Sequence, residues 1–298
     1  MANILATTDL VAQTAASLLK AELVLGRLVF RSVESEFGGG RGEWVRVRVP
    51  RVIEAQPFTG STSAVTKSLD EQTVQVKLTT HAMNGVELTA KDMTLNVESF
   101  SAQVLAPQVA GAAKLIEKTI AGVIQPTINA GTLTIDPANP RDAVTEAGEI
   151  LDTREVDAKS RVLVVDPKVK RALLMDPNLS SVDSAGSPSA LRDAIVGRLH
   201  GFDVYMTPYI TGAVAMTREA FAAAIVAPRK PESAQGASAM DDNNQGYAMT
   251  WWMGLDVEKR QERSIVEAFV GATALDAQRA VGLKLAAPAV MKTGAKRG

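Results

Sequence analysis

The stretch EWVRVRVP, residues 43–50, carries the clearest periodic pattern in the chain. Valines alternate there with Arg46 and Arg48, so the valine side chains face one side of a strand and the arginines face the other. A second alternating run, VQVKLT, follows at residues 74–79. The two runs predict a long antiparallel ribbon.

The stretch between the two runs is polar and contains turn formers such as Pro57 and Gly60. It is longer than the usual hairpin loop of ~2–5 residues, and long loops in compact proteins tend to be functional or mobile. A two-stranded ribbon is only marginally stable alone in water. We therefore expect it to need a partner surface, either on its own domain or on another copy of the chain.

Upstream of the ribbon, the segment GGGRG at residues 38–42 could suggest a phosphate-binding loop. Such a loop ends in Gly-Lys-Ser/Thr and opens a helix, whereas this one leads into a strand, so it is interpreted as a flexible turn. Further upstream, Thr8 predicts a helix start, because its hydroxyl can accept a free backbone N–H. Residues 25–30 look strand-like or extended. The whole segment is either a helix docked on its own domain or an arm that packs on a neighbouring subunit.

Downstream of the ribbon, residues 98–124 form the best long helix candidate, with a late start or a kink expected near Pro107. Lys114, Glu117 and Lys118 lie off its apolar stripe. The stripe indicates that the helix packs on a sheet. Its members recur at helical spacing: Leu105, Val109, Ala112, Ile116, Ile120 and Val123.

The middle of the chain, about residues 126–245, has an α/β pattern. Residues 161–166 predict a buried strand, and Pro167 opens a helix at its first position. The remaining expectations are a helix at 188–199, a strand at 201–205, a helix at 217–224, a short strand at 225–227 and a polar, mobile stretch at 229–246. Strands at 247–257 and 264–270, joined by a charged turn, are predicted to pair and to support the long helix.

Composition narrows the class of protein. The chain has 298 residues, is 46% hydrophobic and 22% charged, and has a formal net charge of −1. These values predict a folded protein, and they disfavour one whose main task is to bind nucleic acid, although a short basic tail runs from Lys292 to Arg297. The absence of cysteine excludes disulfides and thiolate chemistry. We expect no signal peptide and no membrane span.

The sequence offers no positive evidence for catalysis, so we predict a protein that is not an enzyme and has no catalytic, cofactor-binding or metal-binding residues. His81 and His200 do not have metal-ligand spacing, and we expect both in loops or at a rim. The cluster of oxygen ligands at residues 241–244 fails the EF-hand pattern. Trp251 and Trp252, within an apolar strand, are predicted to be core or interface residues.

Four stretches, in the same order along the chain, resemble the major capsid protein of tailed double-stranded DNA bacteriophages, a fold shared with herpesvirus shells and encapsulins. They are LGRLVFRSVESEFGGGRGEWVRVRVP at residues 25–50, RVLVVDPKVKRALL at 161–174, GRLHGFDVYMTP at 197–208 and VEAFVGATAL at 266–275. Together with the order of predicted elements, the resemblance covers nearly the whole chain. No single stretch is a strict motif.

The resemblance implies an α+β fold with an N-terminal arm, an extended β-hairpin loop, a long spine helix, a peripheral domain and a central α/β axial domain. The implied bounds are 1–42 for the arm, 43–80 for the extended loop, 81–126 with 246–285 for the peripheral domain and its spine helix, 127–245 for the axial domain, and 286–298 for a flexible C-terminal tail.

The resemblance also implies a function: copies of the chain would form hexamers and pentamers of an icosahedral shell that encloses double-stranded DNA without reading its sequence. Other implied partners are a scaffolding protein, a portal and a decoration protein, with assembly in the host cytoplasm and a final location in the virion capsid. The extended loop would lie over a neighbour, which marks five inter-subunit contact candidates: Arg46, Arg48, Arg51, Lys67 and Glu71. The Lys–Asn cross-link of some relatives is not inferred from Lys67 alone.

Three alternatives stay open. An encapsulin shell would share the fold but hold a protein cargo. A soluble α/β enzyme with dispersed catalytic groups would be self-contained and have a closed pocket. Another virion protein, such as a tail component, would have less reason to carry a central α/β domain after a long helix.

Overall fold

The computed structural model describes residues 8–31, 44–49, 72–88, 101–176, 195–240, 247–256 and 261–286. The chain divides into two compact units. The first contains Met1–Val123 and Arg218–Ala277, and the second contains Ile124–Thr217 and Gln278–Gly298. The five-part division implied by the resemblance stays a prediction.

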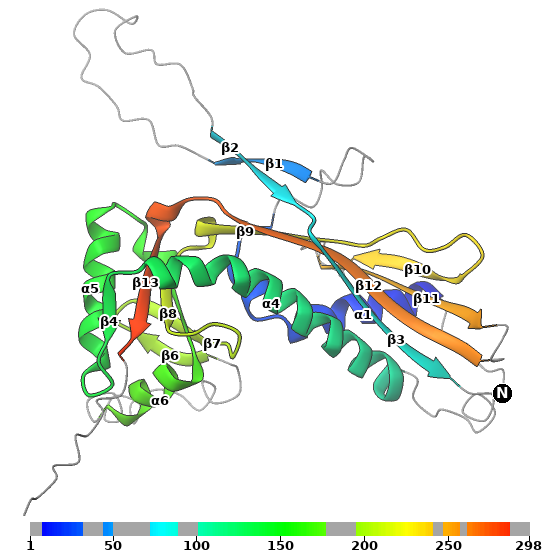
Figure 1. Ribbon diagram of the computed structural model, residues 1–298, viewed down its shortest axis with the longest axis horizontal. Coiled ribbons are helices and arrows are strands. Elements are labelled where there is room, and N and C mark those ends of the chain that lie inside the picture. Colours follow the sequence, from blue (N-terminus) through cyan, green and yellow to red (C-terminus); the bar gives the residue numbers. More distant parts are fainter. Residues whose placement is uncertain are drawn as a thin grey trace, which may run out of the picture. The chain divides into compact units, whose positions relative to one another are not determined.

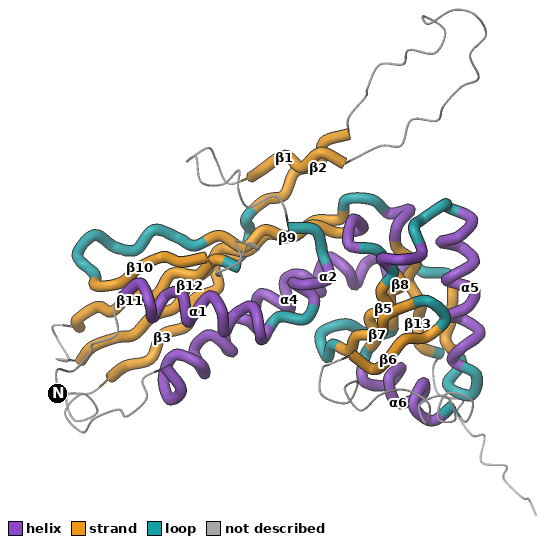
Figure 2. The backbone as a smooth tube through the Cα atoms, turned by 180° about the vertical axis from the view of Figure 1, so that it is seen from behind, coloured by secondary structure: helices purple, strands orange, loops and turns teal. Residues whose placement is uncertain are grey.

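The first unit is α+β. Its elements are α1 (Thr8–Glu22), α2 (Leu25–Leu28), β1 (Trp44–Val49), β2 (Gln72–Lys77), β3 (Thr80–Leu88), η3 (Ser101–Leu105), the first part of α4 (Ala106–Ala130), η6 (Arg218–Ala220), β9 (Phe221–Val226), β10 (Gln235–Met240), β11 (Ala248–Asp256) and β12 (Gln261–Ala274). Four strands form an antiparallel sheet in the order β10-β11-β12-β3, and β9 pairs with the C-terminal part of β12 (Figure 1). Helix α1 packs over β10 and β11 (Figure 2).

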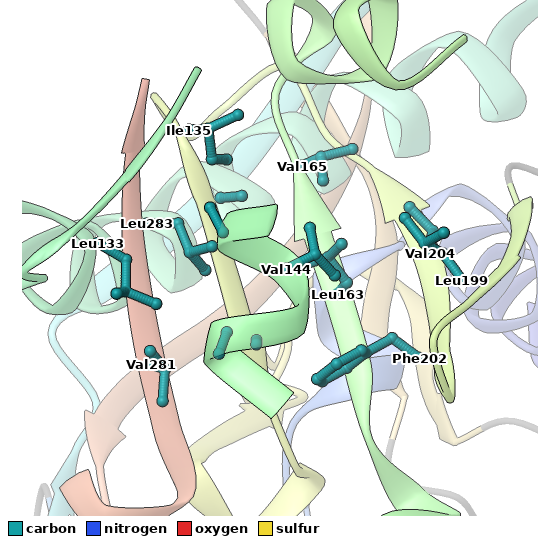
Figure 3. Close-up of a cluster of buried hydrophobic side chains, with 14 of the residues drawn as sticks. Leu133, Ile135, Val144, Leu163, Val165, Leu199, Phe202, Val204, Val281 and Leu283 are labelled. Atoms are coloured by element: carbon teal, nitrogen blue, oxygen red, sulfur yellow. The ribbon is translucent and has the colours of Figure 1, made fainter. Parts of the chain in front are cut away.

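The second unit contains the end of α4 together with β4 (Leu133–Ile135), α5 (Pro140–Thr153), η4 (Ala158–Ser160), β5 (Val162–Val165), α6 (Pro167–Met175), β6 (Ile195–Leu199), β7 (Phe202–Met206), β8 (Ala213–Met216) and β13 (Ala280–Leu285); η7 (Ala277–Arg279) crosses the boundary between the units. The six strands form a mixed sheet in the order β4-β13-β8-β5-β7-β6. Figure 3 shows the core of this unit, where Val144 of α5 lies over strand residues such as Leu163, Val204 and Leu283.

The predicted strand and helix around Pro167 are confirmed. Strand β5 is almost wholly buried, and α6 begins at Pro167, where the missing proline N–H leaves no helical bond unmade. Asp166 caps this helix, because its Oδ1 accepts from Val169 N at 2.6 Å, and its Oδ2 accepts from Gly212 N at 3.1 Å. One carboxylate therefore fixes both the helix start and the backbone that leads into β8.

The helix expected at 188–199 is wrong for its last part, because residues 195–199 form strand β6. The reason lies in the two residues that follow. His200 and Gly201 both have positive φ, 45° and 88°, and two such residues make the tight turn that joins antiparallel strands. Strand β6 therefore pairs with β7 as a hairpin. The prediction of a strand at 201–205 is confirmed by β7.

The helix expected at 217–224 is also wrong. Apart from the short η6 turn, this alanine-rich stretch is strand β9, and all but its last residue are buried. Burial between neighbouring strands overrides the helical preference of alanine. The polar stretch 229–246 was expected to be mobile, but residues 235–240 form β10 and pair with β11. The predicted pairing of the two C-terminal strands is confirmed by β11 and β12.

The long helix is confirmed with the late start expected near Pro107, and it continues past Pro126 to Ala130 instead of ending at residue 124. A π-helical turn, η3, precedes α4, and Pro107 is the second residue of α4, where a helix tolerates proline. At the N-terminus α1 begins at Thr8 as predicted, but residues 25–28 form the one-turn helix α2 and not an extended strand.

No helix among the described residues is long and apolar enough to span a membrane.

Candidate assembly interface

The ribbon is present and has the predicted antiparallel pairing. Its strands β1 and β2 pair over six residue positions, from Trp44 opposite Lys77 to Val49 opposite Gln72. Arg46 and Arg48 lie opposite Gln75 and Thr73 and therefore share one ribbon face.

The five contact candidates are only partly placed. The structure gives the backbone of Arg46 and Arg48 and not their side chains. Arg51, Lys67 and Glu71 lie outside the described residues. Contact with a neighbouring subunit therefore stays a prediction for all five.

The base of the ribbon is held by a small hydrophobic cluster that sequence patterns did not indicate. We call it the ribbon-root cluster: buried Val76, Ala222 and Ala224, with partly buried Phe30, Leu78 and Leu275 packed against them. It joins β2 to β9 and to the segment after α2. The ribbon is therefore anchored at its base to its own subunit.

The path of β2 over β12 depends on a glycine. A Cβ atom built on Gly271 would lie 2.1 Å from the carbonyl oxygen of Lys77, so no other residue fits without moving the backbone. Next to this crossing, Thr79 N donates to Val270 O at 3.2 Å. The close approach fixes where the ribbon leaves the sheet.

The N-terminal segment is docked on its own chain over residues 8–31, which favours the first of the two interpretations left open for it. Ala12, Ala15, Ala16 and Leu19 of α1 are fully buried. Farther along, Phe30 forms a parallel bridge with Ala222 at the edge of β9. Among the described residues, this segment buries most of its apolar side chains without a second subunit, although Leu10 is 53% exposed.

Glu117 was predicted to lie off the apolar stripe of the long helix, but it is only 3% exposed. Its Oε1 accepts from Val24 N at 2.9 Å and from Gly26 N at 3.1 Å, and its Oε2 accepts from Leu25 N at 3.0 Å. The buried face of the helix is wider than the predicted stripe, because Ala113 and Ala121, one turn to either side of Glu117, are also buried.

Burial raises the pKa of the Glu117 carboxyl above its ordinary value of 4.5, against the opposing effects of the three backbone N–H groups and of the Arg27 charge. Between 4.5 and the raised pKa, the folded chain thus binds more protons than the unfolded chain at this group. Its contribution to stability is complete below the unfolded pKa and is lost as pH rises through the folded pKa.

We expect Glu117→Gln to remove this component of the pH dependence. The measurement is the free energy of unfolding of the unassembled subunit by urea, from pH 4.5 to pH 7, for the wild type and the variant. The free energy of unfolding of the wild type should fall relative to that of the variant as pH rises. If the wild type instead gained stability over the variant with rising pH, the folded pKa would be lowered.

Helix α4 is pinned to the sheet by a buried polar network. Gln108 Nε2 donates to Ser264 O at 2.6 Å, Ser264 Oγ donates to Gln108 Oε1 at 3.0 Å, and Trp251 Nε1 donates to Ser264 Oγ at 3.0 Å. Trp251 is 5% exposed, which confirms its prediction as a core residue. Satisfied networks of this kind specify one packing arrangement, because any shift leaves buried polar groups unpaired.

His81 was expected in a loop or at a rim, and it lies instead within β3. Its Nε2 is 2.9 Å from Oε2 of Glu267, a buried carboxylate on β12 whose Oε1 accepts from Trp252 Nε1 at 3.0 Å. The imidazole also stacks at a tilt against Phe269, with ring centroids 4.5 Å apart. This arrangement ties three strands together.

Comparison with known proteins places these features in a family. A family model described as phage capsid protein matches residues 71–268. No curated protein sequence is significantly similar to the chain.

Solved structures share the fold at low sequence identity. A chain from Mycobacterium phage Che8 is 17% identical, with a TM-score of 0.58 over 88% of this chain and 90% of that one. A chain of the mature capsid of bacteriophage PhiM1 is 14% identical, with a TM-score of 0.56 over 87% and 86%. A chain of the capsid of an empty GTA particle is 14% identical, with a TM-score of 0.53 over 96% and 93%.

Proposed function

Because this chain belongs to the phage capsid protein family, we propose that its copies assemble into hexamers and pentamers of an icosahedral shell that encloses double-stranded DNA. The chain is a structural capsid subunit, and its α+β fold is that of phage major capsid proteins. Its location is the virion capsid. Family membership supports a structural role over a catalytic one.

The observation that carries the proposal is the ribbon of β1 and β2. Its base packs on its own unit through the ribbon-root cluster and the crossing at Gly271. A two-stranded ribbon gains little stability alone, so we expect this ribbon to need a further surface. In a shell, the neighbouring copy supplies that surface. The contact candidates Arg46, Arg48, Arg51, Lys67 and Glu71 belong to this proposed interface.

The other proteins that take part in capsid assembly are also part of the proposal. We expect a separate scaffolding protein, a portal and a decoration protein, with assembly in the host cytoplasm. The net charge of −1 suits an inner wall that does not retain DNA through phosphate contacts. The encapsulin alternative differs in cargo, so nuclease-protected DNA within purified virions separates the two.

Negative-stain electron microscopy of the expressed protein tests the assembly. We expect hollow shells or tubes tens of nanometres across. In a loop-deletion variant, a short Gly-Ser turn replaces residues 50–71. This variant should keep the circular dichroism spectrum and unfolding midpoint of the wild type but lose nearly all shells. Shells of normal yield from the shortened chain would remove the ribbon from the interface, and a stable monomer of the full chain would contradict the assembly itself.

A further inference from the structure

The contacts of Glu117 extend beyond the helix that carries it. The short helix α2 begins without a side-chain cap of its own, since Val24 makes no capping hydrogen bond. The first backbone N–H groups of a helix have no partner within it. Glu117 of α4 supplies the acceptors from 91 to 93 residues away in the sequence, and its two oxygens take three successive N–H groups.

Four residues after this contact, the same segment joins the edge of β9. Phe30 N donates to Phe221 O at 2.9 Å, and Ala223 N donates to Phe30 O at 3.0 Å. The intervening Leu28 and Val29 are 7% and 1% exposed. Residues 24–30, which we call the strap, are thus fixed at both ends, and apart from exposed Arg27 the residues between the ends are buried.

The far end of the strap reaches the ribbon. The Phe30 side chain packs against the ribbon-root cluster, in which Val76 belongs to β2. A continuous set of contacts therefore leads from α4 through the strap to the base of the ribbon. Coupling between separated sites travels through packed and hydrogen-bonded groups of this kind.

We propose that Glu117 is a positioning residue for the ribbon, which it couples to α4 through the strap, so that release of its carboxylate loosens the ribbon base. The strap holds Phe30 against β9 only while its first residues are tied to α4. These contacts all lie within one subunit, so the coupling does not depend on shell formation.

Glu117→Gln is the direct test, because the amide keeps the shape but turns one acceptor oxygen into a donor. At least one of the three backbone N–H groups then faces an N–H₂ group and loses its bond. Amide hydrogen exchange of the unassembled subunit should become roughly tenfold faster at Leu25 and Gly26, and also at Phe30, Ala223 and Thr79. Exposed Glu146 of α5 provides the matched control, and Glu146→Gln should change none of these rates.

A general loss of stability would speed exchange throughout the sheet, so the β10–β11 pairing and the β5–β7 pairing serve as internal references. Both should stay protected in Glu117→Gln. Faster exchange at Leu25 and Gly26 alone, with Phe30, Ala223 and Thr79 unchanged, would overturn the coupling. Unchanged exchange at Leu25 and Gly26 would show that the hydrogen bonds of Glu117 do not hold the start of the strap, and would overturn the proposal.

A second variant tests whether Glu117 acts through Phe30. Phe30→Ala cuts the strap at its far end, and it should speed exchange at Ala223 and Thr79 while Leu25 and Gly26 stay protected. In the double variant, Glu117→Gln should add nothing further at Ala223 and Thr79 if it acts through Phe30. Additive effects at these two amides would show that the two residues act independently and would contradict the proposal.

Discussion

Gly271→Ala is expected to lower the free energy of unfolding by about 3 kcal/mol, the upper end of the usual cost of overpacking. The new Cβ would lie 2.1 Å from Lys77 O and 3.1 Å from Leu78 Cα. Both are backbone atoms, so no rotamer change relieves the clash. Strand β2 has to move away from β12, which strains the Thr79–Val270 hydrogen bond and withdraws Val76 from the ribbon-root cluster.

The same chemical change at Gly122 is the matched control, because its Cβ would meet nothing within 4 Å. Gly122 lies within helix α4, so Gly122→Ala should stabilise the chain by about 0.5–1 kcal/mol. Urea unfolding of the unassembled subunits measures both effects, and the two substitutions should differ in sign. A neutral Gly271→Ala would mean that the ribbon leaves the sheet along a different path.

The ribbon, the long helix and the strand before Pro167 could be predicted because each carries a local signal. Alternation over residues 43–50 and 74–79 indicates a strand whatever it packs against, and a proline directly after an apolar run, such as Pro167, is favoured at the first position of a helix. Elements with weaker local signals were predicted wrongly. The alanines of β9 favour a helix in isolation, and only their burial between strands makes them a sheet.

The candidate site was less predictable because its contacts join residues far apart in the sequence. Glu117 is a charged residue of the kind that usually faces solvent on a helix. It becomes a buried hydrogen-bond acceptor only because residues 24–26 lie against it. Gly271 lies in the middle of a strand, where nothing local shows that another strand crosses it. The turn at His200 and Gly201 is different, because its glycine is a local signal: glycine readily adopts the positive φ that a two-residue hairpin turn requires.

Phe202→Ala is expected to lower the free energy of unfolding by about 3–5 kcal/mol, the typical cost of removing a large core side chain. Phe202 is fully buried in the core of the second unit, among the residues drawn in Figure 3. Its ring rests against α5, where a Cβ on Gly148 would lie 3.6 Å from Phe202 Cε2. A cavity at this position opens between α5 and β7, and β7 cannot move to fill it without straining its ladder with β5.

Met175 serves as the control, because it is a large apolar side chain that is not buried: it is 69% exposed at the end of α6. The free energy of unfolding of Met175→Ala should stay within about 0.5 kcal/mol of the wild-type value. Denaturant unfolding of the two variants separates the cost of the cavity from that of a smaller side chain. Natural domains are stable by only about 5–15 kcal/mol, so Phe202→Ala should also reduce the fraction of subunits that are folded and able to assemble. A loss no larger than that of Met175→Ala would show that the sheet and α5 do not share a packed core at Phe202.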